Sequence, residues 1–203
     1  MTIADDLTVA ELKTYVRSEL LTEDSIYQAA IDTAKAIVNN ATGRNFVVAD
    51  PAVSTARSYR ASNGVIQLIH DAAAIVSVTD NGTTITSGTD YQAEPLNGLS
   101  DTGESVPYYA LRRLSYYGLR WYNWYGLPGA ASVVVTARWG WPAIPPLVKE
   151  SWKIVAKDVF NQRNTSGFGL VAITEAGGVG TRENRIVQEM VTAYAHPGSI
   201  VVG

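Results

Sequence analysis

The sequence predicts an α+β protein: a small helical bundle with a β-rich insertion between its second and third helices and an extended C-terminal arm. Apolar residues recur at helical spacing in two segments before residue 44 and in one after residue 145. Between residues 54 and 138 the period shifts towards two, with several glycine-containing turn signals. Residues 167–180 are rich in glycine. We therefore expect four parts, residues 1–53, 54–138, 139–166 and 167–203.

Capping signals mark the starts of the first two helices. Thr8 and Glu11 have the spacing of a capping box, which predicts a helix to about Leu20. Thr22 is the expected cap of a second helix, with Glu23 and Asp24 in its first turn, where the helix dipole favours anions. The expected apolar stripe of this helix is Ile26, Ala30, Ala34, Ile37 and Ala41, and Gly43 is its expected end.

The middle of the chain contains one clear hairpin signal. Two β-prone runs, Ile75–Thr79 and Thr83–Thr86, flank the pair Asn81-Gly82. Asn-Gly readily adopts the positive φ angles of a two-residue hairpin turn, so we expect these runs to pair.

A strand, a corner and a third helix follow. Residues 132–138 are rich in β-branched side chains, and Gly140 and Pro142 end the strand. Pro145 and Pro146 suit the first turn of a helix. The expected buried face of this helix is Val148, Trp152, Val155 and Val159. Residues 164–180 then predict a linker to a short last helix near Glu183–Tyr194.

Composition excludes several classes of protein. At 203 residues, with 46% hydrophobic and 17% charged residues, the chain can bury a core and is not of disordered composition. It has no cysteine and therefore no disulfide framework. The N-terminal residues lack the basic start and apolar run of a signal peptide, and no stretch is apolar enough to predict a membrane span.

The net charge of −3 argues against a dedicated DNA-binding protein. Residues 1–40 hold three basic and seven acidic residues. Residues 41–163 hold eleven basic and nine acidic residues, and residues 164–203 hold two basic and three acidic residues. This distribution suits either self-association between copies or ordinary solvated helix faces.

Arginines and aromatic residues concentrate between Tyr108 and Tyr125. This stretch allows nucleic-acid stacking with phosphate contacts, a carbohydrate-binding platform, a protein interface, or a hairpin whose rings pair across strands. The residues that we assign to a subunit or tail interface here are Arg112, Arg113, Trp121, Trp124 and Tyr125.

Lys149, Lys153 and Lys157 recur every four residues on the third predicted helix. They form either a solvated face or an electrostatic contact with the DNA backbone or an acidic helix of a neighbouring copy. We favour carboxylates such as Glu23, Asp24 or Asp32 of that copy, and we add the lysines to the predicted interface.

No motif predicts catalysis or a cofactor. His70 and His196 are far apart and lack the spacing of metal ligands, and no nucleophile elbow is present. The glycine-rich Ala176–Thr181 lacks the lysine of a P-loop, which predicts a linker. We therefore expect no enzyme activity, no metal and no cofactor.

Three segments carry a resemblance to a known family. They are VTARWGWPAIPP with the helix that follows it, the N-terminal LTVAELKTYV with SIYQAAIDTAKAIVNNATGRNF, and TRENRIVQEMVTAYAHP near the end. Together they resemble the head–tail connector, or adaptor, proteins of long-tailed bacteriophages. Residues from about 47 to 129 lie outside the resemblance, and the β-rich insertion departs from the plainest members.

The resemblance implies a structural virion protein of the head–tail junction, made in the host cytoplasm, without a membrane partner. It implies a ring, twelvefold by analogy, that docks on the portal protein, extends the DNA channel and meets the next connector or tail-completion protein. DNA would pass without sequence-specific binding. The expected portal-binding arm comprises Arg182, Ile186, Val187, Met190 and Tyr194. The alternative hypothesis is a carbohydrate-binding module of a virion or cell surface, based on Trp121, Trp124 and Tyr125.

Overall fold

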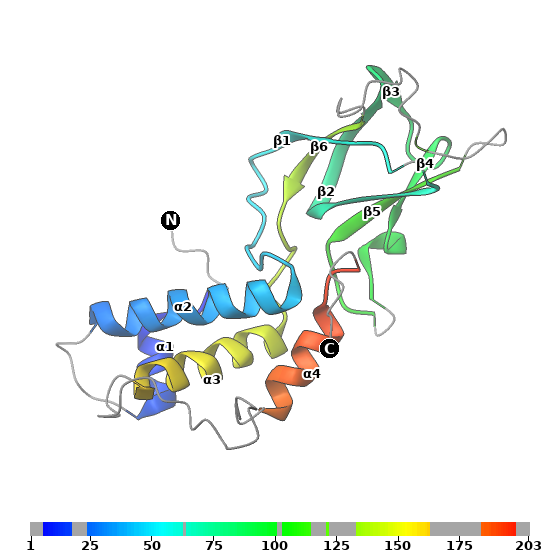
Figure 1. The fold of residues 1–203 in the computed structure, drawn as a ribbon. Helices are drawn as coiled ribbons and strands as arrows, with labels where there is room; N and C mark the ends of the chain where they lie inside the picture. Colours follow the sequence, from blue (N-terminus) through cyan, green and yellow to red (C-terminus); the bar gives the residue numbers. More distant parts are fainter. Residues whose placement is uncertain are drawn as a thin grey trace. The chain divides into compact units, whose positions relative to one another are not determined.

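The computed structural model describes residues 6–17, 24–62, 64–100, 103–114, 121, 133–162 and 184–197. These residues form four α-helices, a 3₁₀ turn and a six-stranded antiparallel sheet (Figure 1). The chain divides into two compact units, a helical unit of residues 1–44 and 144–203 and a sheet unit of residues 45–143. The predicted α+β class is therefore confirmed.

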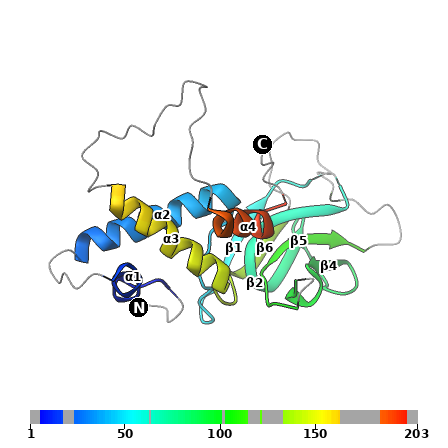
Figure 2. The same ribbon diagram turned by 90° about the horizontal axis from the view of Figure 1, so that it is seen from below.

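The helical unit contains α1 (Val9–Val16), α2 (Asp24–Thr42), α3 (Pro146–Gln162) and α4 (Arg185–Tyr194). Helices α2 and α3 lie side by side in both views, and α1 and α4 also contact them (Figures 1 and 2). Tyr27 of α2 stacks on Phe160 of α3, with ring centroids 4.4 Å apart. The side chains buried in this unit are mainly Leu7, Leu12, Tyr27, Ile31, Val38, Val148, Trp152, Ile154 and Met190.

The first helix begins as predicted but ends earlier. The Thr8 and Glu11 capping box is present, and it satisfies two amide groups at the start of α1. Arg17 adopts a left-handed conformation with φ 57°, and its amide donates to the carbonyls of Lys13 and Thr14. This C-terminal cap stops the helix at Val16, and not near Leu20 as we expected. Residues 18–23, with the expected cap Thr22, lie outside the described residues.

The buried face of α2 is rotated from the predicted stripe. Ala30 and Ala34 are buried as expected, whereas Ile37 is 46% exposed and Ala41 is also exposed. Tyr27, Ile31 and Val38 take their places in the core. The buried face is therefore shifted by about one position along the helix, so that Tyr27, Ile31 and Val38 pack beside Ala30 and Ala34. Gly43, with φ 65°, ends the helix as predicted.

Helix α3 begins at Pro146 as the prolines predicted. Val148 and Trp152 are fully buried, whereas Val155 and Val159 are only half-buried. Ile154 and Ala156 complete the face that packs in the helical unit.

The sheet unit contains β1 (Thr55–Tyr59), β2 (Ile66–Asp80), β3 (Thr83–Ile85), β4 (Tyr91–Glu94), β5 (Tyr108–Arg113) and β6 (Val133–Trp139). The strand order is β1-β6-β2-β5-β4, and β3 pairs with the end of β2. The long β2 pairs with β5 through its first half and with β6 through its second half, with register shifts that bend it. The core comprises Ile69, Ala72, Val78, Tyr91, Leu111, Trp121, Val133, Val135 and Ala137.

The predicted hairpin turn is confirmed. Asn81 and Gly82 have φ angles of 47° and 81°, and strands β2 and β3 pair directly on either side of them. Positive φ at both central residues is the geometry of a type I′ turn.

The tryptophan–proline corner closes the sheet unit. The amide of Trp141 donates to the carbonyl of Val47 at 2.7 Å, and the amide of Ala49 donates to the carbonyl of Trp141 at 2.9 Å. Gly140 has φ 122°, and a Cβ atom there would lie 2.4 Å from the Val47 carbonyl oxygen. Only glycine allows this close approach of two backbone segments. The buried Trp141 side chain donates to Asp71 at 3.2 Å.

Candidate interaction surfaces

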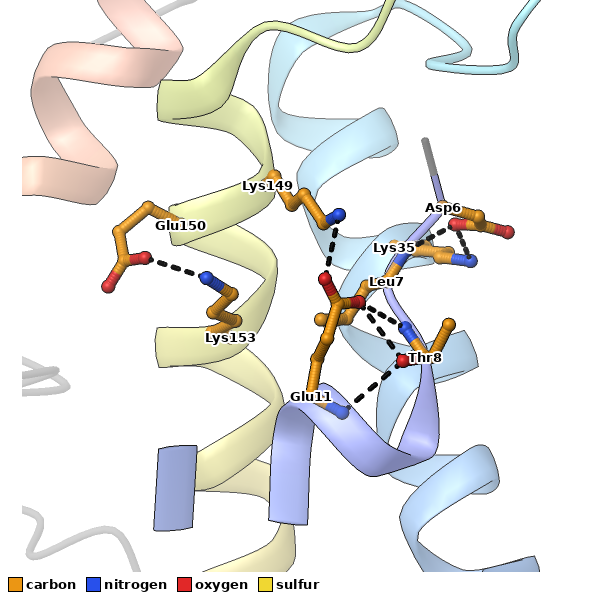
Figure 3. Close-up of polar contacts among 8 residues, drawn as sticks. All are labelled: Asp6, Leu7, Thr8, Glu11, Lys35, Lys149, Glu150 and Lys153. Carbon is orange, nitrogen blue, oxygen red and sulfur yellow. Dashed lines mark hydrogen bonds and ion pairs between the residues drawn. The ribbon is translucent and has the colours of Figure 1, made fainter. Parts of the chain in front are cut away.

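The lysine row of α3 is engaged within its own unit. Figure 3 shows Lys149 pointing to Glu11 of α1, with 2.9 Å between Nζ and Oε1. Lys153 pairs with Glu150 at 3.2 Å on the same helix. The Lys157 ammonium lies 5.8 Å from the ring centre of Tyr15. Each lysine therefore has a neighbour within the unit, and the contact of this row with another copy stays a prediction.

Of the three acidic residues proposed as partners, two form contacts within the helical unit and the third is not described. Asp24 pairs with Lys13, and Asp32 accepts a hydrogen bond from Gln28 at 2.9 Å. Glu23 lies outside the described residues. In the described structure, the three lysines and the two described acidic residues, Asp24 and Asp32, therefore all have neighbours within the helical unit.

Glu11 is the centre of this network. One carboxylate oxygen accepts from the Thr8 amide at 2.9 Å, and the other accepts from Lys149 (Figure 3). The Thr8 amide, followed by Lys149, lowers the pKa of Glu11 from 4.5 to about 2, although partial burial opposes the shift. Glu11 therefore links the start of α1 to α3 through a charge that is present at neutral pH.

Trp121 belongs to the sheet core. Its side chain is fully buried, and its indole N–H donates to the carbonyls of Val65 at 3.2 Å and Leu111 at 3.3 Å. The assignment of Trp121 to an interface or a sugar platform is therefore wrong. Trp124 and Tyr125 lie outside the described residues. The same stretch holds one described strand, β5, which pairs with β2 and β4.

The two arginines of β5 have different surroundings. Arg113 lies over the Trp121 ring at 5.1 Å and pairs with Asp80 at 3.4 Å. Burial raises the pKa of Asp80, and the Arg113 charge partly opposes that rise. Arg112 pairs with Glu94 at 2.8 Å, but its side chain is 44% exposed. Of the two, Arg112 can be reached from outside.

A surface cluster that sequence reasoning missed lies on β1, β2 and β6. The Tyr59 hydroxyl is 2.7 Å from Nδ1 of His70 and accepts from the His70 amide at 3.1 Å. The His70 ring meets Trp139 edge-on at 6.3 Å, and Arg57 lies over Trp139 at 4.4 Å. Burial raises the pKa of Tyr59, partly opposed by the hydrogen bond from His70. In the sequence, the only sign of this cluster was that Arg57 and Tyr59 are two residues apart, which places them on the same face of a strand.

Helix α4 packs on its own unit. Met190 is fully buried, and the Tyr194 carbonyl accepts from the Arg44 guanidinium at 2.7 Å. The His196 amide also donates to the Thr42 carbonyl at 2.8 Å. The described part of the segment that we expected as an extended arm therefore packs on the helical unit. Ile186 stays 40% exposed, Val187 is half-buried, and Arg182 lies outside the described residues.

Within the described ranges, no three His, Cys, Asp or Glu side chains gather in a way that could hold a metal ion. No helix among these residues is long and apolar enough to cross a membrane. The glycine-rich Ala176–Thr181 lies outside the described residues.

Comparison with known proteins shows a likeness in fold to a solved structure. No protein-family model matches the chain, and no curated protein matches its sequence. The fold is similar to a chain in a solved structure described as the neck of an empty GTA particle computed with C6 symmetry. The TM-score is 0.53 and the sequence identity 14%, and the match covers 100% of this chain and 96% of the other. The likeness shows a shared fold over both units.

Proposed function

We propose that this chain is a structural neck protein of a phage-like particle, with the role of a head–tail adaptor and no enzymatic activity. The observation that carries the proposal is the fold similarity to a neck chain over almost the full length of both proteins. The sequence resemblance to connector proteins rests on separate grounds and agrees with it. The protein would form a ring on the portal, extend the DNA channel and support attachment of the tail.

The outer face of α2 is a suitable surface for contact between copies. One exposed strip of this helix has small or apolar side chains, namely Ala29, Thr33, Ala36, Ile37 and Ala41, with the exposed Asp32 beside it. Small side chains let another helix approach closely, and Ile37 supplies apolar area to bury. A ring of twelve copies, as the resemblance implies, is compatible with the C6 symmetry used for the structure of the neighbour.

The portal contact is proposed for the exposed part of the C-terminal segment. The Met190 side chain is buried in the helical unit, so it holds α4 in place and does not contact a partner. Ile186 is 40% exposed, and we propose it, together with Arg182, as a contact with the portal. In this arrangement α4 is held on its own unit and presents one face outwards.

DNA is expected to pass without sequence-specific binding. The chain is acidic overall, and its lysine row is engaged by carboxylates and a tyrosine ring within the helical unit. Each phosphate contact would add salt-dependent affinity and slow the passage of DNA.

The proposal is tested by adding the purified full chain to portal-bearing heads that lack the neck. We expect a ring of added density on the portal and restored attachment of tails. Ile37→Glu should prevent ring formation, whereas Gln28→Glu on the opposite face of α2 should not. Failure of the wild-type chain to bind the heads would refute the adaptor role.

A further inference from the structure

Strand β1 is an open edge of the sheet. Within the described residues it pairs only with β6. Residues 50–58 are all exposed, and the strand contains no proline. Natural proteins usually cover or interrupt such an edge, because its unpaired backbone groups can bind another strand.

The register identifies the backbone groups that face outwards. The Gly140 amide, directly after β6, donates to the Asp71 carbonyl of β2. Backbone groups alternate along a strand, so the odd-numbered residues of β6 face β1. Their partners in β1 are also odd-numbered, from Thr55 to Tyr59. The amides and carbonyls of Ala56 and Ser58 therefore face away from the sheet.

Side-chain contacts hold this edge in place. The Trp139 indole donates to the Thr55 carbonyl at 2.8 Å, and Arg57 lies over the same indole at 4.4 Å. Tyr59 is fixed by its two hydrogen bonds to His70. Thr55, Arg57 and Tyr59 are thus held in place. Binding of another strand would therefore cost less conformational entropy.

The opposite edge of the sheet is protected. In β4 the Tyr91 amide donates to Thr86 at 3.4 Å, and its carbonyl accepts from Gly88 at 2.8 Å. Pro95 follows the strand and has no amide hydrogen to offer. Among the described residues of β4, only Ala93 keeps both outward backbone groups without a hydrogen-bond partner. Among the residues that the structure describes, β4 is therefore protected and β1 is left accessible.

The charge around β1 indicates what can bind there. Arg57, Arg60 and Arg138 lie on or beside the strand, and the nearby carboxylate of Asp50 already accepts from the Ala52 amide. Two such edges from two copies would repel each other. An incoming strand with carboxylates would gain from the arginines as well as from backbone hydrogen bonds.

We propose that β1 is a strand-addition site for an extended, acidic segment of another protein. The segment would extend the sheet beside β1 through the outward amides and carbonyls of Ala56 and Ser58. Its carboxylates would meet Arg57 on one face and Arg60 on the other. This site goes beyond the proposed neck role and does not depend on it.

The test measures amide hydrogen exchange of Ala56 and Ser58 in the full chain. The probe is a capped peptide of alternating valine and glutamate, and its control has lysine in place of glutamate. With the glutamate peptide at ten times its dissociation constant, exchange at both amides should slow about tenfold. Exchange should stay unchanged at Ala93, and the lysine peptide should give no comparable effect.

Two variants separate the backbone and charge contributions. Ser58→Pro removes an outward amide that β6 does not use, so it should abolish protection while Ser58→Ala retains it. Arg60→Glu should reverse the preference between the two peptides. The proposal is overturned if the glutamate peptide protects neither amide or if both peptides protect equally. It is also overturned if the two amides become protected by a second copy as the chain is concentrated without peptide.

Discussion

Replacing Glu11 with glutamine tests the link between α1 and α3. The substitution keeps the size of the side chain but removes the charge that accepts from Thr8 and Lys149. A pKa lowered from 4.5 to about 2 corresponds to at most about 3.4 kcal/mol of stability at neutral pH. The Glu11 side chain is 40% exposed, however, so water screens the interaction. We therefore expect Glu11→Gln to lower the free energy of unfolding by about 1–1.5 kcal/mol at pH 7.

The pH dependence has a defined sign. Because folding lowers the pKa of Glu11, its stabilisation is complete above pH 4.5 and is lost as the pH falls towards 2. The difference between the wild-type chain and Glu11→Gln should therefore shrink across this range. Other carboxylates titrate in both proteins, so the comparison isolates position 11.

Urea unfolding followed by the helical circular dichroism signal measures the difference at pH 7 and at intervals below pH 5. Glu189→Gln is the matched control, because Glu189 forms an exposed pair with Arg185 one turn away within α4. That control should change stability by no more than about 0.5 kcal/mol. Equal stability of wild type and Glu11→Gln at pH 7, or a difference that grows in acid, would refute the reasoning.

Three further substitutions test the packing of the two units by thermal or urea unfolding. Gly140→Ala should destabilise the sheet unit by more than about 2 kcal/mol, because the added Cβ atom would lie 2.4 Å from the Val47 carbonyl oxygen. Gly64→Ala is its control and should change stability little, because the nearest atom to its added Cβ lies 3.7 Å away. Trp121→Ala should unfold the sheet unit at a cost of about 3–5 kcal/mol, and a stable variant defective only in assembly would contradict its place in the core. Met190→Ala should cost about 2–5 kcal/mol in the helical unit, and an unchanged melting curve would show that α4 is not packed there.

Local signals in the sequence predicted the elements well. The capping box at Thr8, the Asn81-Gly82 turn and the proline start of α3 each specify backbone geometry through residues close in sequence. Such signals do not depend on the rest of the fold. The end of α1 could not be predicted, because Arg17 adopts a left-handed conformation that more often selects glycine.

The candidate surfaces were harder to predict because burial depends on tertiary packing. Composition alone did not distinguish Trp121 in the core from Trp139 on the rim. The partner of Lys149 is Glu11, 138 positions away along the chain, and no spacing rule links the two. The open edge of β1 follows from the strand order, in which β6 lies between β1 and β2. The sequence alone does not specify this order.

We propose that this chain occupies the neck of a phage-like particle. Electron cryo-microscopy of particles assembled with and without this chain measures that most directly. We expect the chain to account for a ring at the head–tail junction, in contact with the portal, that is missing from particles without it. A complete neck in particles that lack the chain, or density for the chain elsewhere on the particle, would contradict the account.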